Sequence, residues 1–219
     1  MKDKHSENTL RYTPAEEIVN SLSHGLGALL SVAGLVVLII FASMYGDNWH
    51  IVSFSIYGST LIVLYASSTL YHSIPRPTVK KVLMKLDHSA IFLLIAGTYT
   101  PFVLVSLRGA WGWSLFGIVW ALAIAGITLK SITIVRFRKL SVVIYLFMGW
   151  LGLVAIKEIV TAVPLESFTL LLIGGFSYTI GVIFYAWRKI PFNHGIWHAF
   201  VLCGSVLHFF WVLSILPPH

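Results

Sequence analysis

Seven long runs of apolar residues, none of which contains a charged side chain, follow one another along the chain. They cover residues 25–45, 51–71, 88–107, 110–129, 140–156, 167–187 and 194–216. A helix needs about 20 apolar residues to cross a hydrocarbon layer of ~30 Å. Strands of a membrane barrel would instead alternate apolar and polar residues over segments of about ten. The pattern therefore predicts an all-α integral membrane protein, a bundle of seven transmembrane helices.

The residues before the first run are polar and of mixed charge. They predict a cytoplasmic N-terminal segment, residues 1–24, that leads into the membrane through a short amphipathic helix. The first apolar run exceeds the ~7–15 residues of a signal-peptide core, so we interpret it as an uncleaved span. No Gly/Ser-rich linker divides the rest of the chain, and residues 25–219 are expected to form one transmembrane domain.

The basic residues of the loops predict the orientation in the membrane. With seven spans, 13 of the 15 lysines and arginines fall on the side of the N-terminus, and only Arg108 and Lys157 fall on the other. The 13 are Lys2, Lys4, Arg11, Arg76, Lys80, Lys81, Lys85, Lys130, Arg136, Arg138, Lys139, Arg188 and Lys189. Short cytoplasmic loops carry the excess of positive charge, so the N-terminus is expected in the cytoplasm and the C-terminus outside it.

Composition agrees with this interpretation and removes other classes. The chain is 58% hydrophobic and only 11% charged, which excludes an ordinary soluble domain. The net charge of +7 is explained by the loops that set orientation, so no nucleic-acid partner is expected. The single cysteine, Cys203, excludes both an intrachain disulfide and a cysteine-rich metal site.

Polar residues gather at the cytoplasmic ends of several predicted helices. Helical spacing puts each group on one face, and the set comprises Glu17, Asn20, His24, Ser68, His72, Asp87, His194 and His198. Asp87 is expected at the start of the third helix. Three imidazoles with a nearby carboxylate and no thiolate suit a zinc ion held by three protein ligands and one water. The alternative is a hydrogen-bonded polar cluster that holds the helices together.

The other histidines have simpler interpretations. His208 lies near mid-bilayer, where a hydrogen bond to a neighbouring helix is expected rather than metal ligation. His88 is next to Asp87 but about 100° away around the helix, and it is expected to be a structural neighbour rather than a ligand. His24 shares the leaflet of the cluster and is expected to support or pack against the ligands.

Three spaced motifs resemble those of a known family. Glu17-x-x-Asn20-x-x-x-His24, Ser68-x-x-x-His72 followed by Asp87, and His194-x-x-x-His198 are similar to the signature motifs of the hemolysin III and progestin/adipoQ receptor (PAQR) family. The resemblance implies a zinc ion (Zn2+) bound by His72, His194 and His198. It also implies that Asp87 contacts the metal-bound water and that Ser68 assists. The family belongs to a wider group of membrane hydrolases that includes alkaline ceramidases.

Three functions follow as hypotheses. The first is a ceramidase-like, zinc-dependent intramembrane hydrolase of lipid amides or esters, with membrane lipids as substrate or ligand. The second is a non-enzymatic membrane protein with a structural zinc, either a pore-forming hemolysin or a regulator of membrane state. The third is a haem-binding electron carrier, which ranks last because an i,i+4 histidine pair points both rings the same way. The resemblance implies a multi-pass protein of the bacterial cytoplasmic (cell) membrane.

Overall fold

The computed structural model describes residues 12–132 and 138–217, and all its regular elements in these ranges are helical. Seven of its helical stretches are long and apolar enough to cross a membrane, which confirms the predicted seven-helix bundle. They are formed by α1 (Pro14–Tyr45), α2 (Asn48–Ser73), α3 (Pro77–Pro101) with η1 (Phe102–Ser106), α4 (Ala110–Ile132), α5 (Arg138–Trp150) with η2 (Leu151–Ala155) and α6 (Ile156–Ala162), α7 (Leu165–Ala186), and α8 (Asn193–Leu213).

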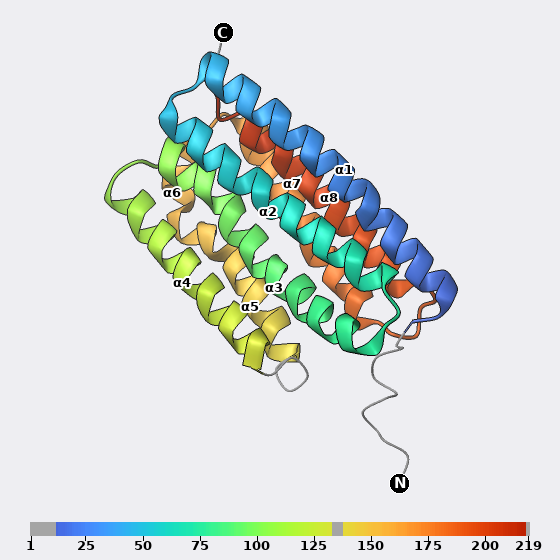
Figure 1. The fold of residues 1–219 in the computed structure, drawn as a ribbon. Coiled ribbons are helices and arrows are strands. Elements are labelled where there is room, and N and C mark those ends of the chain that lie inside the picture. Colours follow the sequence, from blue (N-terminus) through green and yellow to red (C-terminus); the bar gives the residue numbers. More distant parts are fainter. Residues whose placement is uncertain (1–11, 133–137, 218–219) are drawn as a thin grey trace.

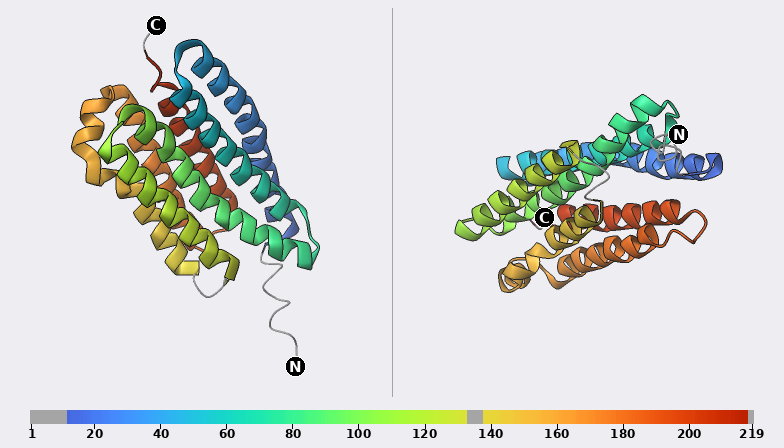
Figure 2. Two further views of the ribbon diagram at one scale, coloured as in Figure 1. Left: turned by 60° about the vertical axis from the view of Figure 1, so that its left-hand side comes forward. Right: turned by 90° about the horizontal axis from the view of Figure 1, so that it is seen from below.

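The helices form two layers. Seen from below, α1 to α4 lie in one layer and α5 to α8 in the other, and α1 lies along α8 where the layers meet (Figure 2). Helix α1 begins at one end of the bundle and α8 finishes at the other (Figure 1). This arrangement agrees with the odd number of spans. Which end faces the cytoplasm stays a prediction from the basic loops. Several residues used for that prediction lie outside the described part of the chain, namely Lys2, Lys4, Arg11, Arg136, Pro218 and His219. The side chains of Arg138 and Lys139 lie outside it as well.

Helix α1 begins well before the first apolar run. Thr13 caps it, because its side chain accepts a hydrogen bond from the backbone of Glu16 while the Glu16 carboxylate bonds back to Thr13, and Pro14 occupies the first turn. The helix then continues unbroken to Tyr45, so the expected boundary between residues 24 and 25 lies inside it. Residues 1–11 of the expected N-terminal segment lie outside the described part of the chain.

The expectation that the third helix starts at Asp87 is wrong. Helix α3 starts at Pro77, ten residues earlier, with proline in its first turn. Its buried face there includes Lys80, Leu83 and Asp87, which are three and four residues apart and therefore share one side of the helix. A charge-free run marks only the part of a helix that lies in the hydrocarbon layer, and here Lys80, Lys81 and Lys85 lie in the helix before that run begins.

The third and fifth spans are not regular α-helices throughout. Pro101 ends α3, and the chain continues as a π-helical turn, η1, as expected where a proline removes a backbone donor. In the fifth span the 3₁₀ segment η2 separates α5 from α6. The backbone amide of Gly152 in η2 donates to the hydroxyl of Tyr99 on α3, at 2.7 Å. A contact between spans thus accompanies the break.

At the end of the bundle opposite to the start of α1, an ion pair joins two loops. Asp47 caps α2 by accepting hydrogen bonds from the amides of Trp49 and His50. Its other carboxylate oxygen accepts a hydrogen bond from the Arg108 guanidinium, 2.5 Å away, in the connection before α4. The two side chains are about half exposed, so the pair contributes at most about 1 kcal/mol.

Candidate metal centre

Three buried histidines meet at the end of the bundle where α1 begins. His72 comes from the last turn of α2, and His194 and His198 come from the first two turns of α8. One ring nitrogen from each lies within 4.8 Å of the others. These are the three histidines that the resemblance implied as ligands, brought together from helices far apart in the sequence.

The ring nitrogens of two of these histidines have defined roles. His72 Nδ1 donates a hydrogen bond to Glu17 at 2.5 Å, and its Nε2 is buried with no hydrogen-bond partner among the described residues. His198 Nδ1 donates to the backbone carbonyl of Asn20 at 3.1 Å, and the Ser23 hydroxyl lies at the same distance. In both rings a protonated Nδ1 leaves the lone pair on Nε2 for another ligand.

The donor set is chemically suited to a zinc ion. Imidazole nitrogens are ordinary zinc ligands, and a buried nitrogen without a partner is costly unless something binds it. Nitrogens bound at 2.0–2.1 Å around a tetrahedral ion lie roughly 3.3 Å apart. The present spacing of up to 4.8 Å is therefore at most about 1.5 Å wider than that of nitrogens bound to one ion.

The remaining residues of the predicted site take different positions. Asp87 lines the same cavity as His194 and His198, and its carboxylate is 3.7 Å from the ring of His88. Ser68 lies one turn before His72 on α2, is fully buried, and its hydroxyl has no hydrogen-bond partner among the described residues. Asp87 thus lies outside the three-histidine group, and the supporting roles expected for Asp87 and Ser68 stay predictions.

Other histidines agree with their expected roles. His24 stacks on His198 with ring centroids 3.4 Å apart and planes 9° apart, so it packs directly behind a candidate ligand. His208 bonds through Nε2 to the backbone carbonyl of Leu171 on α7, 3.1 Å away. His88 bonds through Nδ1 to the carbonyl of Met84 in its own helix.

Two contacts of the cluster were not predicted. Tyr12 stacks on His194 with ring centroids 4.9 Å apart. Lys80 bonds to Glu17 at 2.9 Å and so reaches the cluster, whereas the sequence predicts for it only a contribution to orientation in the membrane. The sequence does indicate the position of Lys80 once the helix is started at Pro77, because the i,i+7 spacing then places Lys80 on the same face as Asp87.

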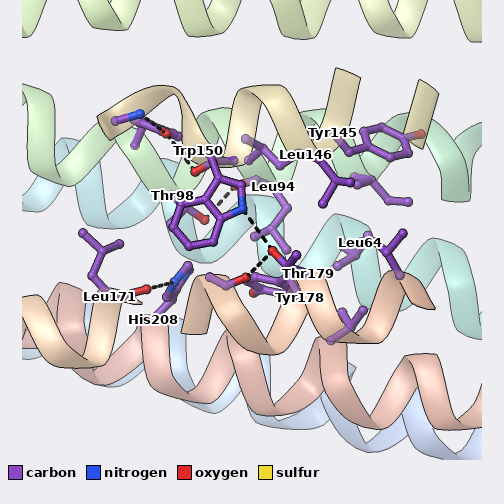
Figure 3. Close-up of a pocket in the computed structure, with 18 of the residues that line it drawn as sticks. Leu64, Leu94, Thr98, Tyr145, Leu146, Trp150, Leu171, Tyr178, Thr179 and His208 are labelled. Carbon is purple, nitrogen blue, oxygen red and sulfur yellow. Dashed lines mark hydrogen bonds between the residues drawn. The ribbon is translucent and has the colours of Figure 1, made fainter. Parts of the chain in front are cut away.

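An apolar cavity of about 190 Å³ extends from the histidines toward the middle of the bundle. Helices α3, α5, α7 and α8 contribute most of its wall, which is mainly leucine, isoleucine and aromatic side chains. Figure 3 shows its deeper part, where the Trp150 indole donates to Thr179 on α7 and His208 bonds to Leu171. The cavity is therefore long and apolar, with the polar cluster at one end.

Comparison with known proteins agrees with the motifs. A family model described as haemolysin-III related matches residues 12–209. The chain belongs to the haemolysin III family. The resemblance based on the three motifs is thereby confirmed, and the protein is a multi-pass membrane protein of this family.

Relatives of this haemolysin III family member include bacterial and animal proteins. Hemolysin-3 of Bacillus cereus is 52% identical over 203 residues, which cover 93% of each chain. A hemolysin-3 homolog of Bacillus subtilis (strain 168) is 52% identical over 202 residues, covering 92% of this chain and 95% of the relative. The human monocyte to macrophage differentiation factor is 26% identical over 208 residues, covering 91% of this chain and 85% of the relative.

Proposed function

We propose that this haemolysin III protein is a zinc-dependent hydrolase of lipid amides or esters in the bacterial cytoplasmic membrane. The observation that carries the proposal is the combination of three clustered histidines with the apolar cavity that begins beside them. The histidines offer the ligand set of a catalytic zinc site with one open position. The cavity offers a place for the hydrocarbon part of a lipid.

His72, His194 and His198 would hold the ion. When bound, zinc supplies a water whose pKa is lowered toward about 7 and a positive charge that polarises a carbonyl oxygen. These properties are the ones that cleavage of an amide or ester requires at neutral pH. The burial of the three histidines supports this role, because an electrostatic interaction is stronger where bulk water is excluded.

Asp87 is proposed to orient the attacking water and to accept its proton. The carboxylate lines the cavity together with two of the histidines and lies outside the ligand group itself. It is therefore available as a base. Ser68 is fully buried one turn before His72, and its hydroxyl has no hydrogen-bond partner among the described residues; its proposed role is to donate to the oxygen of the substrate carbonyl as negative charge develops there.

The cavity supports a lipid substrate rather than a small polar one. Its deeper wall is mainly apolar, and polar groups there are bonded to one another or to the backbone, as Trp150 is to Thr179 and His208 is to Leu171. A hydrocarbon chain would fill this space, while a head group near the histidines would present the scissile bond. Membrane lipids are therefore the substrate class proposed for the site.

The test of the hydrolase is Asp87→Asn, which keeps the size of the side chain and removes its charge and basicity. Purified wild-type protein should contain about one zinc per chain and should cleave at least one lipid amide or ester from a broad panel. Asp87→Asn should keep most of the zinc and lose roughly 10–100-fold in hydrolysis. Asp47→Asn, at the far end of the bundle, is the matched control and should keep full activity.

A second candidate function rests on the names of the closely similar relatives, hemolysin-3 and its homolog. In it the protein is a non-enzymatic membrane lysin or regulator of membrane state, and the zinc is structural. This hypothesis expects no cleavage of any lipid by the wild-type protein. It also expects Asp87→Asn to lyse erythrocytes, or to support the cellular phenotype, as well as wild type does.

A further inference from the structure

Glu17 connects a candidate zinc ligand to a buried lysine. One carboxylate oxygen accepts the hydrogen bond from His72 Nδ1, and the other lies 2.9 Å from Lys80 Nζ. The side chains of His72 and Lys80 are almost completely buried, and that of Glu17 is 16% exposed. Helices α1, α2 and α3 each contribute one member of this chain of contacts.

The bond to Glu17 determines which nitrogen of His72 faces the cluster. Because a carboxylate only accepts, Nδ1 carries the proton and Nε2 presents its lone pair, which is the atom without a partner. A carboxylate behind a metal-binding histidine fixes the direction of the ring and makes its free nitrogen more basic. Glu17 occupies that position toward His72.

Lys80 holds the Glu17 carboxylate in place. Its ammonium group also donates to the backbone carbonyl of Tyr71 at 2.8 Å and lies 4.8 Å from the centre of the Tyr71 ring. Tyr71 directly precedes His72, so Lys80 bonds both to the Glu17 carboxylate and to the backbone next to His72. A lysine is rarely so buried unless it is paired, and here the pairing also neutralises a carboxylate that would be costly alone.

His198 is held differently. Its Nδ1 donates to the backbone carbonyl of Asn20, one turn along α1 from Glu17, and no charged group takes part in that bond. Substitution of side chains can therefore alter the support of His72 while the backbone support of His198 remains.

We propose that Glu17 and Lys80 act together as a positioning pair for His72, fixing its tautomer and ring direction so that Nε2 binds the zinc ion. This inference rests on the proposed metal centre. It assigns a role to Glu17, which the motifs singled out without explaining, and to Lys80, which lies outside every motif.

The experiment compares two double variants that remove the buried charges together, so that neither partner is left unpaired. Glu17→Leu with Lys80→Met removes the acceptor for His72. Glu17→Gln with Lys80→Met keeps a neutral acceptor oxygen at the same place. The matched control is Asp47→Asn with Arg108→Met, which removes the ion pair at the other end of the bundle.

Zinc affinity is measured on each purified, folded protein by competition with a chelator, and the melting temperature of the zinc-free protein is measured separately. The double variant carrying Glu17→Leu should bind zinc about 10–100-fold more weakly than wild type. The double variant carrying Glu17→Gln should recover a large part of that loss, because the hydrogen bond to Nδ1 is restored. The control should bind zinc as wild type does.

Three outcomes are distinguishable. If both double variants bind zinc as tightly as wild type and differ only in melting temperature, the pair is a structural ion pair and the positioning role is refuted. If both lose affinity equally, a neutral acceptor on Nδ1 does not support zinc binding, so fixing the tautomer and ring direction is not what Glu17 contributes, and the inference is overturned. If wild-type protein binds no zinc, the proposed metal centre fails, and the positioning role fails with it.

Discussion

Replacing one candidate ligand should abolish the stabilisation of the fold by zinc. We choose His198→Ala, because this ring is 2% exposed and reaches both other histidines, with ring centroids 4.5 Å from His194 and 5.2 Å from His72. Two remaining histidines are too few for a site of three protein ligands. Substitution of a residue that only supports a metal ligand weakens metal binding by up to roughly 100-fold, and the loss of zinc affinity in His198→Ala should be larger than that.

The expected size of the effect follows from linkage. At a free zinc concentration about 100 times the wild-type Kd, binding stabilises the folded state by about 2.7 kcal/mol. For a protein of 219 residues this corresponds to a rise in Tm of roughly 5–10 °C. A variant that binds 100-fold more weakly retains about 0.4 kcal/mol, or roughly 1 °C, at the same zinc concentration.

The assay is thermal unfolding in detergent, with and without zinc at that fixed free concentration. His208→Ala is the matched control, because His208 lies ten residues further along α8, is also buried, and is bonded to Leu171 rather than to the cluster. It should lower the Tm of the zinc-free protein slightly and leave the zinc-induced rise intact. An equal zinc-induced rise in both variants would show that the ion binds elsewhere, and no rise in wild type would refute the centre.

Three further predictions use other parts of the molecule. A reporter fused to the N-terminus should behave as cytoplasmic and one fused to the C-terminus as extracytoplasmic; a cytoplasmic C-terminal reporter would contradict the orientation drawn from the basic loops. The Arg108 guanidinium holds the pKa of the Asp47 carboxyl well below its usual range. Wild-type protein should therefore be more stable than Asp47→Asn, fully so above about pH 4, and the difference should be lost as the pH falls through the lowered pKa. This stability gap is measured by unfolding in low salt, and a gap that grows as the pH falls would contradict it. Gly149 lines the cavity, and a Cβ atom added there would meet no atom within 4 Å, so Gly149→Leu should narrow the cavity and reduce lipid hydrolysis while zinc content stays at the wild-type level. Unchanged hydrolysis would show that the substrate does not use this space.

The transmembrane part of the fold could be predicted from the sequence because the bilayer imposes it. Each apolar run must satisfy its own backbone hydrogen bonds, so length and lack of charge were enough to locate seven helices. The same criterion failed wherever a helix extends beyond the hydrocarbon layer. Helix α3 begins at Pro77, and in its first turns Lys80 is buried against Glu17, a contact between distant residues that apolar runs cannot reveal.

The site was predictable to the extent that it depends on helical spacing. The i,i+4 spacing places His194 and His198 on one face of α8, and the topology puts His72 at the same end of the bundle. What spacing could not give is the direction of each ring. The Glu17 bond to His72 and the stacking of His24 on His198 depend on the rotation of α1 about its axis, which only packing determines.

The histidine cluster joins distant parts of the chain, with His72 on the second span and His198 on the last. The bond from His198 to Asn20 closes a loop of 178 residues. Helices α1 and α2 are neighbours in sequence and can pair early during synthesis, whereas α8 emerges last. The three-histidine cluster can therefore be completed only after the final helix has entered the membrane. A nascent chain that stops before Asn193 would lack His194 and His198, so the proposed activity would be restricted to completed molecules.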